Sequence, residues 1–272
     1  MLWTRIWPSL LLFFCTFSIG LASEDIRIAS ASPAVTQMIY FLNAQDHMVA
    51  RSDFCKDPKE VTSKPSIGSA YNFNYELAKK LGISTVISSR TSLVKFKQRL
   101  KQMDIELLEL RAKNFDELVQ NLKRVGKKVK AEKLDSKIQS LQERIQNIKK
   151  DQKGSYLFVH AVSKKNGRVQ GLYVAGQGSI YSDLINKTGL TNKSDNLKEE
   201  SHLMPLEKVM LKNPKYIFWQ EKVGELIESS KALKQLSSKH IEILENNFKL
   251  PGPNLVSLPS KINSMLTIKD AE

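Results

Sequence analysis

The sequence predicts an α/β protein of two lobes, each with a central, mostly parallel sheet flanked by helices, joined by one long backbone helix. Three observations predict this. Short apolar strands alternate with helical patterns from Ile26 to about Leu110, as in parallel βαβ units. A helical pattern without Gly or Pro follows over 127–150. The strand–helix alternation then restarts over 155–258, so a second sheet lobe follows the helix.

The first lobe is expected to span 23–126. Its expected strands lie near 27–30, 48–51, 85–88 and 106–110. A Ser-Pro turn at Ser32-Pro33 leads into the first helix. Asn114 is expected to cap a later helix, which carries apolar residues at helical spacing and ends at Gly126.

The segment 127–150 is expected to form the helix between the lobes. Apolar residues recur there at steps of three and four, and at 1.5 Å per residue the helix would span on the order of 30 Å. These are Val129, Leu134, Ile138, Leu141, Ile145 and Ile148. An intermolecular coiled coil is the alternative. The second sheet lobe after this segment favours a helix that connects two lobes.

The second lobe is expected to span 151–272. Its expected strands are 156–162, 171–175, 216–219 and 254–257, and its expected helices are 180–188, 205–211 and 223–236. The strand 156–162 is almost continuously apolar, which is typical of a strand covered on both faces of its sheet.

Residues 1–22 are expected to be a cleavable export signal. Arg5 supplies the positive start, Ser9 to Ile19 is apolar, and small residues stand three and one positions before the end of Gly20-Leu21-Ala22. A membrane anchor is the alternative, but the apolar run is short for a span of about 20 residues. No stable membrane insertion is expected after cleavage. Only Cys55 then remains, so no intrachain disulfide can form, and a buried thiol is expected.

The net charge of +14 could attract nucleic acid, an anionic ligand or an anionic membrane surface. The basic residues are spread along the chain rather than clustered with aromatic residues. This distribution favours a Lys-rich, solvated surface, and no nucleic-acid partner is expected.

The sequence holds no motif typical of an enzyme, because G-x-S-x-G and H-E-x-x-H are absent and no nucleophile stands beside a base. The turn Gly176 to Ser179 lacks the Lys and the third Gly of nucleotide-binding loops, which favours a tight turn that a ligand approaches. The histidines are not at metal-ligand spacing, so no metal site is expected. His160, within a strand, is a weak candidate for a ligand of haem iron and is favoured as a core residue.

Aromatic side chains at the ends of the expected strands are the main signal for a ligand site. Parallel sheets bind ligands at the carboxyl ends of their strands, and a cleft between two lobes collects both edges. Arginines at the same level could meet carboxylates or phosphates of a ligand. The expected ligand-binding residues are Pro33, Arg51, Asp53, Phe54, Tyr71, Phe73, Arg90, Tyr173, Gln177 and Trp219. Asp53 could instead pair with Arg51 or Arg90.

Four segments carry a resemblance to a known family: the opening segment 27–55, IGSAYNFNYE at 67–76, GLYVAGQGSIYSDLI at 171–185 and LMPLEKVMLKNPKYIFW at 203–219. Through them the whole mature chain resembles the periplasmic substrate-binding proteins of ABC importers for vitamin B12, iron–siderophore complexes and haem. One departure stands at Leu81 to Val86, where the usual Pro-Asp is missing.

The resemblance implies a binding protein without enzymatic activity or a cofactor of its own. It implies a periplasmic, monomeric protein whose lobes open little because one rigid helix joins them. It also implies that Glu76 and Glu207, one on each lobe, dock on a permease. The Asp53-Phe54-Cys55-x-x-Pro58 form looks most like members for cobalamin, so cobalamin is the first expected cargo, followed by ferric siderophore and haem. A secreted hydrolase-like enzyme and a free-metal-ion receptor remain as alternatives.

Overall fold

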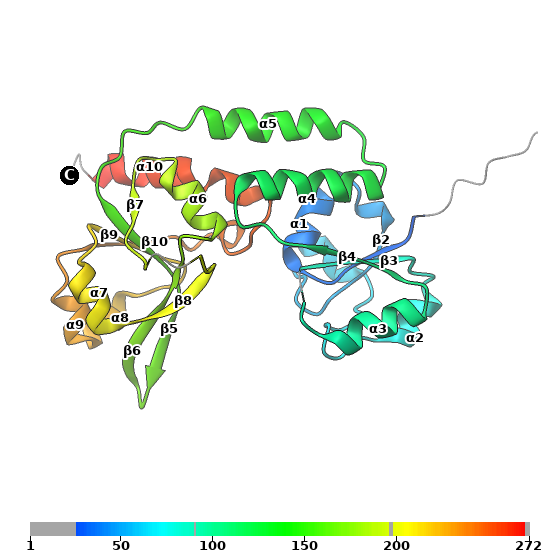
Figure 1. Ribbon diagram of the computed structural model, residues 1–272, viewed down its shortest axis with the longest axis horizontal. Helices are drawn as coiled ribbons and strands as arrows, with labels where there is room; N and C mark the ends of the chain where they lie inside the picture. Colours follow the sequence, from blue (N-terminus) through cyan, green and yellow to red (C-terminus); the bar gives the residue numbers. More distant parts are fainter. Residues whose placement is uncertain (1–25, 90, 196–197, 270–272) are drawn as a thin grey trace, which may run out of the picture.

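Two sheet lobes lie side by side beneath a shared layer of helices (Figure 1). The computed structural model describes residues 26–89, 91–195 and 198–269, so the expected export signal lies outside the described residues. Among the described helices, none is both long enough and apolar enough to cross a membrane. The expected fold class of two α/β lobes is confirmed.

The N-terminal lobe contains a sheet of four parallel strands in the order β2-β1-β3-β4. The strands are β1 (Ile28–Ser30), β2 (Met48–Arg51), β3 (Thr85–Ser89) and β4 (Glu106–Leu110). All four were predicted from the sequence. Because the strands are parallel, their carboxyl ends lie along one edge of the sheet, where the loops after β1, β3 and β4 gather.

Helices cover both faces of this sheet. They are α1 (Pro33–Phe41), α2 (Tyr75–Lys80), α3 (Val94–Gln102) and α4 (Phe115–Lys128). Successive residues of a strand point to opposite faces, so Ile28 packs with α1 and α4 while Ala29 packs in the cluster of α2 and α3. Short 3₁₀ turns at Gln45–His47 and Lys59–Ser63 flank β2. Cys55 is fully buried, as expected.

The helix expected over 127–150 starts later and is shorter, and it runs antiparallel to the helix before it. Helix α4 continues through Gly126 to Lys128, the chain turns, and α5 (Leu134–Gln146) returns toward the second lobe (Figure 1). Gly126 does not end the helix. A Cβ at Gly126 would lie 2.5 Å from Leu134 Cδ1, so the missing side chain leaves room for α5 to pack on α4. As predicted, Asn114 caps α4, because its Oδ1 accepts a hydrogen bond from the Glu117 N–H at 2.8 Å.

The C-terminal lobe contains a mixed sheet in the order β10-β9-β5-β6-β8. Strands β10, β9 and β5 are parallel, whereas β5–β6 and β6–β8 are antiparallel. The strands are β5 (Ser155–Lys165), β6 (Arg168–Ala175), β7 (Thr191–Asn192), β8 (Ser201–Pro205), β9 (Tyr216–Trp219) and β10 (Lys239–Glu242). The short β7 pairs with the start of β5.

Helices also cover both faces of the second sheet. They are α6 (Ile180–Asn186), α7 (Leu206–Lys212), α8 (Gly224–Ser229), α9 (Lys231–Lys234) and α10 (Leu258–Lys269), with 3₁₀ turns at Asn246–Phe248 and Pro253–Ser257. The strand expected at 254–257 was wrong. Its short apolar run fits either structure, and the chain there is a 3₁₀ turn with Leu255 and Val256 buried against the helices.

One hydrophobic core runs through both lobes. Phe158 of β5 and Ile28 of β1 belong to the same cluster, together with buried side chains of α1, α4, α5, α6 and α10. The opposite face of the second sheet has its own core, formed with α7, α8 and α9. The lobes are therefore held together by a packed layer of several helices rather than by one helix, and this layer closes the top of the space between them (Figure 1).

Candidate functional site

A pocket of about 650 Å³ lies between the two lobes. The first lobe supplies most of its lining, from the start of α1 and the loops after β3 and β4. Glu200, just before β8, and Pro251 are the contributions of the second lobe. Because both lobes line it, this pocket is the candidate ligand site, and its size falls in the range of small-molecule sites.

The lining of the pocket combines apolar side chains with hydroxyl groups. Ala34, Val35 and Met38 of α1 are among the apolar lining residues. The hydroxyl side chains come from the end of β3 and the loop that follows it and are those of Ser89, Thr91 and Ser92. An apolar lining with a few polar groups is the usual composition of a pocket for an organic ligand.

Two ion pairs border the pocket. Lys97 Nζ lies 2.7 Å from Glu109 Oε2, and Glu109 Oε1 accepts a hydrogen bond from the Thr91 N–H at 2.8 Å. This pair is internal to the first lobe. The second pair joins Arg111, which follows β4, to Glu200 of the other lobe. It is a direct polar link between the lobes inside the pocket.

The predicted ligand residues of the first lobe fall into different environments. Phe54 and Tyr71 are strongly exposed, 66% and 87%, on adjacent loops that are joined by a hydrogen bond from the Asp53 N–H to Gly68 O. Phe73, in contrast, is buried against Tyr75 and Phe96. The structure therefore leaves Phe54 and Tyr71 exposed on neighbouring loops and places Phe73 in the core.

The polar residues predicted in this lobe contact the protein itself. The guanidinium of Arg51 donates to the carbonyls of Ser52 and Thr62, and Asp53 accepts a hydrogen bond from the Ser66 hydroxyl. Pro33 is half-buried at the first position of α1, next to the lining residues of that helix. Arg90 lies outside the described residues.

In the second lobe, Tyr173 is the exposed aromatic residue of the predicted set. It is 42% exposed and pairs across β6 and β8 with Leu203, which is 45% exposed. Tyr173 stands two residues before Ala175, which packs in the shared core, so both lie on the sheet face turned to α6. The pair thus forms an apolar patch on the sheet face opposite to the one that α7, α8 and α9 cover.

Trp219 and His160 are enclosed by protein. Trp219 ends β9 as expected, but its side chain is fully buried and its Nε1–H donates to His240 Nδ1 at 3.1 Å. His160 packs edge-on against Phe158 and Tyr181, and its Nδ1 lies 2.7 Å from Gln220 Oε1. Burial lowers the pKa of His160, and the hydrogen bond to Gln220 opposes that shift. The neutral imidazole is therefore the stable form at neutral pH.

The glycine turn after β6 serves close packing of two backbone segments. A Cβ at Gly176 would lie 2.1 Å from Glu199 O, and one at Gly178 would lie 2.3 Å from Lys198 O. The Gly176 N–H donates to Glu200 O at 3.0 Å. A ligand was expected to approach the backbone of this turn, but the segment 198–200 packs against it instead. The same segment contains Glu200, which lines the pocket.

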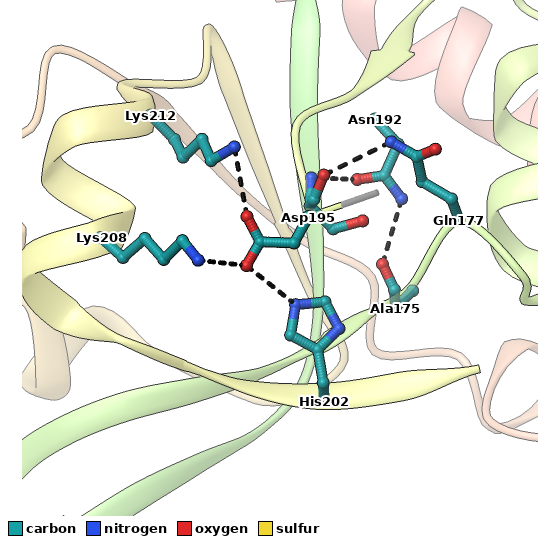
Figure 2. Close-up of polar contacts among 8 residues, drawn as sticks. Ala175, Gln177, Asn192, Asp195, His202, Lys208 and Lys212 are labelled. Atoms are coloured by element: carbon teal, nitrogen blue, oxygen red, sulfur yellow. Dashed lines mark hydrogen bonds and ion pairs between the residues drawn. The ribbon is translucent and has the colours of Figure 1, made fainter. Parts of the chain in front are cut away.

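A polar cluster connects this turn to helix α7 (Figure 2). The buried Asn192 donates to Ala175 O at 3.0 Å, and Gln177 Nε2 donates to Ser194 O at 3.4 Å. These contacts hold the loop that presents Asp195.

Asp195 in turn contacts two lysines of α7. Its carboxylate lies 2.5 Å from Lys208 Nζ and 3.3 Å from Lys212 Nζ, and His202 Nε2 lies 3.9 Å away (Figure 2). The hydrogen bond from Lys208 is the largest effect on the pKa of Asp195, which the two lysines lower. The two ion pairs therefore connect α7 to the loop that carries Asp195.

The two glutamates expected to dock on a permease are both exposed. Glu76 lies in the first turn of α2 and Glu207 in the first turn of α7. On α7, Leu211 is also strongly exposed, 86%, one helical turn after Glu207. Lys208 and Lys212, by contrast, are turned to Asp195.

Sequence reasoning missed several polar and charged residues of the pocket. Arg111 directly follows the predicted strand 106–110, and Thr91 and Ser92 follow the predicted strand 85–88. Because ligands bind at the carboxyl ends of parallel strands, these positions could have been identified from the sequence. Glu200 had no such signal, because strand β8 was not predicted. Within the described ranges, His, Cys, Asp and Glu do not gather in any group of three or more that could hold a metal ion.

Comparisons with known proteins agree with this architecture. A family profile described as "Periplasmic binding protein" matches residues 28–241. No curated protein matches the sequence. A possible iron-binding, periplasmic solute-binding protein from Staphylococcus epidermidis is similar in structure, with 20% identity, a TM-score of 0.72, and coverage of 88% of this chain and 97% of that one.

Two proteins of Vibrio cholerae are also similar in structure. The periplasmic vitamin B12-binding protein has 19% identity and a TM-score of 0.68, over 91% of this chain and 98% of that one. The periplasmic haem-binding protein has 18% identity and a TM-score of 0.68, over 89% and 99%. At this identity the likeness concerns the fold. The family profile covers most of the chain, and the chain therefore belongs to the periplasmic binding protein family.

Proposed function

We propose that this protein is the substrate-binding component of an ABC importer, which captures a metal-chelate cofactor between its lobes and delivers it to a permease. The observation that carries the proposal is the pocket of about 650 Å³ lined by both lobes. Membership of the periplasmic binding protein family supports it. The protein would act by binding rather than by catalysis, after export to the periplasm.

Three exposed aromatic side chains that do not line the pocket would suit a large, partly apolar chelate that extends beyond it. Phe54 and Tyr71 offer exposed aromatic rings at one lobe edge, and Tyr173 offers another on the second lobe. Flat ligands bind such rings by stacking. Cobalamin remains the first proposed cargo, before ferric siderophore and haem, and similar folds include proteins described as binding vitamin B12 and haem.

The shared helical layer supports a mostly preformed site. Because one core runs through both lobes, large rotation of one lobe against the other would expose buried side chains such as Phe158 and Leu118. Cargo binding would then involve side chains and loops of the cleft more than closure of the lobes.

The test is direct measurement of bound cargo. Native mass spectrometry of the protein purified from its own host should reveal a metal chelate as added mass. Equilibrium dialysis with cyanocobalamin, a ferric siderophore and haemin should then identify the class, because each absorbs visible light. Absence of any bound chelate in both measurements would contradict the proposal.

A pair of substitutions locates the site. Ser92 lines the pocket, so Ser92→Trp should fill part of it and lower cargo affinity about tenfold or more. Ser140, exposed on α5, supplies the matched control, and Ser140→Trp should leave affinity unchanged. Equal effects of the two substitutions would place the cargo elsewhere.

A further inference from the structure

Arg111 and Glu200 form an ion pair that crosses the pocket from one lobe to the other. Both Nε and Nη2 of Arg111 contact Oε1 of Glu200. The two side chains remain 41% and 39% exposed. The pair is therefore open to solvent and accessible to a molecule that enters the pocket.

The backbones of both residues are fixed by other contacts. The buried Asn121 donates to Arg111 O at 2.9 Å, and Arg124 donates to Glu109 O at 3.0 Å beside it. On the other lobe, Glu200 O accepts the hydrogen bond of the Gly176 N–H. Exchange of partners would thus involve the two side chains alone and would leave both backbone segments in place.

The other cation in the pocket already has a partner within its own lobe. Lys97 pairs with Glu109, whose second oxygen is held by the Thr91 N–H. Arg111 differs because its counter-ion comes from the opposite lobe. An ion pair at such exposure contributes little to stability, because water screens the attraction and hydrates both charges when they separate. A guanidinium also binds planar anions through two parallel hydrogen bonds, so it can accept another carboxylate in place of Glu200.

We propose that Glu200 is an internal counter-ion for Arg111, which an anionic group of the cargo displaces on binding. The inference rests on the proposed function of this pocket. It narrows the cargo to metal chelates that carry a carboxylate, phosphate or similar anion at their edge. Glu200 acts as a specificity residue: it competes with such a group for Arg111, and displacement breaks a polar link between the lobes.

The experiment is a double-mutant cycle with ligands of different charge. Haemin, with two carboxylates, is compared with its dimethyl ester. Glu200→Gln should raise the affinity for haemin about three- to tenfold, because the competitor for Arg111 is removed, and Arg111→Gln should lower it by about tenfold or more. In the double variant the effect of Glu200→Gln should vanish. The affinity for the ester should change less than about twofold, since it offers no carboxylate to Arg111.

Glu199→Gln is the matched control, because Glu199 is the exposed neighbour and carries the same charge. It should leave all affinities unchanged. Equal increases in haemin affinity from Glu199→Gln and Glu200→Gln would mean that only the overall charge matters, and this would overturn the inference. An unchanged or lower haemin affinity in Glu200→Gln would also overturn it.

A titration with an anion that is not a metal chelate tests this inference independently of the proposed function. Citrate is titrated while the Nε–H resonance of Arg111, assigned by its loss in Arg111→Gln, is followed by NMR. Displacement of Glu200 by citrate, with tighter binding in Glu200→Gln, would support the anion site even if no chelate binds and the proposed cargo class fails. No response of Arg111 to either citrate or haemin would overturn the inference, whatever other chelate the protein takes.

Discussion

The backbone N–H of Phe115, at the start of α4 in the first lobe, donates to Asp183 Oδ2 in the second lobe at 2.9 Å. The bond places a carboxylate of α6 against the first turn of α4, where the backbone N–H groups lack partners within the helix. It lies beside a second pocket, lined by Lys113, Asn114 and Asp183 among others. This contact and the Arg111–Glu200 pair are two polar links between the lobes.

Removal of the Asp183 carboxylate should weaken the joint between the lobes. We expect Asp183→Ala to lower the free energy of unfolding by about 1–2 kcal/mol, because a charge-assisted hydrogen bond to the α4 terminus is lost. Urea denaturation followed by circular dichroism measures this. Asp135, in the first turn of α5 and exposed, is the matched control, and Asp135→Ala should cost clearly less. Equal losses would mean that the cross-lobe bond contributes nothing.

Acid should destabilise the protein through two half-buried histidines. Burial lowers the pKa of His240 and of His160 in the folded protein, the latter against the opposing hydrogen bond to Gln220. The unfolded chain takes up protons near pH 6.5, where the folded protein does not. Stability is therefore complete above that pH and is lost as the pH falls below it.

The measurement is urea unfolding at pH 7.5 and at pH 5.5. The free energy of unfolding should be lower at pH 5.5, and the difference should shrink in His160→Gln and in His240→Gln. His240 Nδ1 accepts the hydrogen bond of Trp219, so acid unfolding should also appear in tryptophan fluorescence. A pH dependence that is identical in both variants and the original protein would refute the assignment.

The turn after β6 should not tolerate a side chain at Gly176. A methyl group there would lie 2.1 Å from Glu199 O, so backbone must move, and we expect Gly176→Ala to lower the free energy of unfolding by about 1–3 kcal/mol. Gly224→Ala is the control, since a Cβ at Gly224 meets no atom within 4 Å. A Gly176→Ala variant as stable as the Gly224→Ala variant would mean that segment 198–200 can shift without cost.

The exposed glutamates of α2 and α7 should act in transport and not in cargo capture. We expect the double variant Glu76→Ala, Glu207→Ala to reduce cargo uptake by the host at least about tenfold, since each loss removes a charge pair with the permease. Cargo affinity measured by dialysis should stay unchanged, because neither residue lines the pocket.

Glu225 provides the control for this prediction. It is also exposed in the first turn of a short helix of the second lobe, and Glu225→Ala should leave uptake unchanged. Normal uptake by the double variant would remove both glutamates from the docking surface.

Local sequence patterns sufficed for most strands and helix starts. The strands at 48–51, 106–110 and 216–219 have the expected bounds, because short apolar runs between turn residues carry their own signal. The cap at Asn114 is equally local, since donor and acceptor stand three residues apart. Local sequence patterns do not reveal whether a side chain at a strand end is exposed. Trp219 ends its strand as expected, yet α7, α8 and α9 cover the sheet face to which it points.

The sequence by itself determined two α/β lobes in order along the chain, because strands and helices follow from the spacing of apolar residues. Tertiary structure alone decided that α5 folds back on Gly126, that several helices share one core between the lobes, and that Arg111 meets Glu200. The last two residues stand 89 positions apart. Their pairing depends on how two separately formed sheets pack beneath common helices, and no local periodicity records that packing.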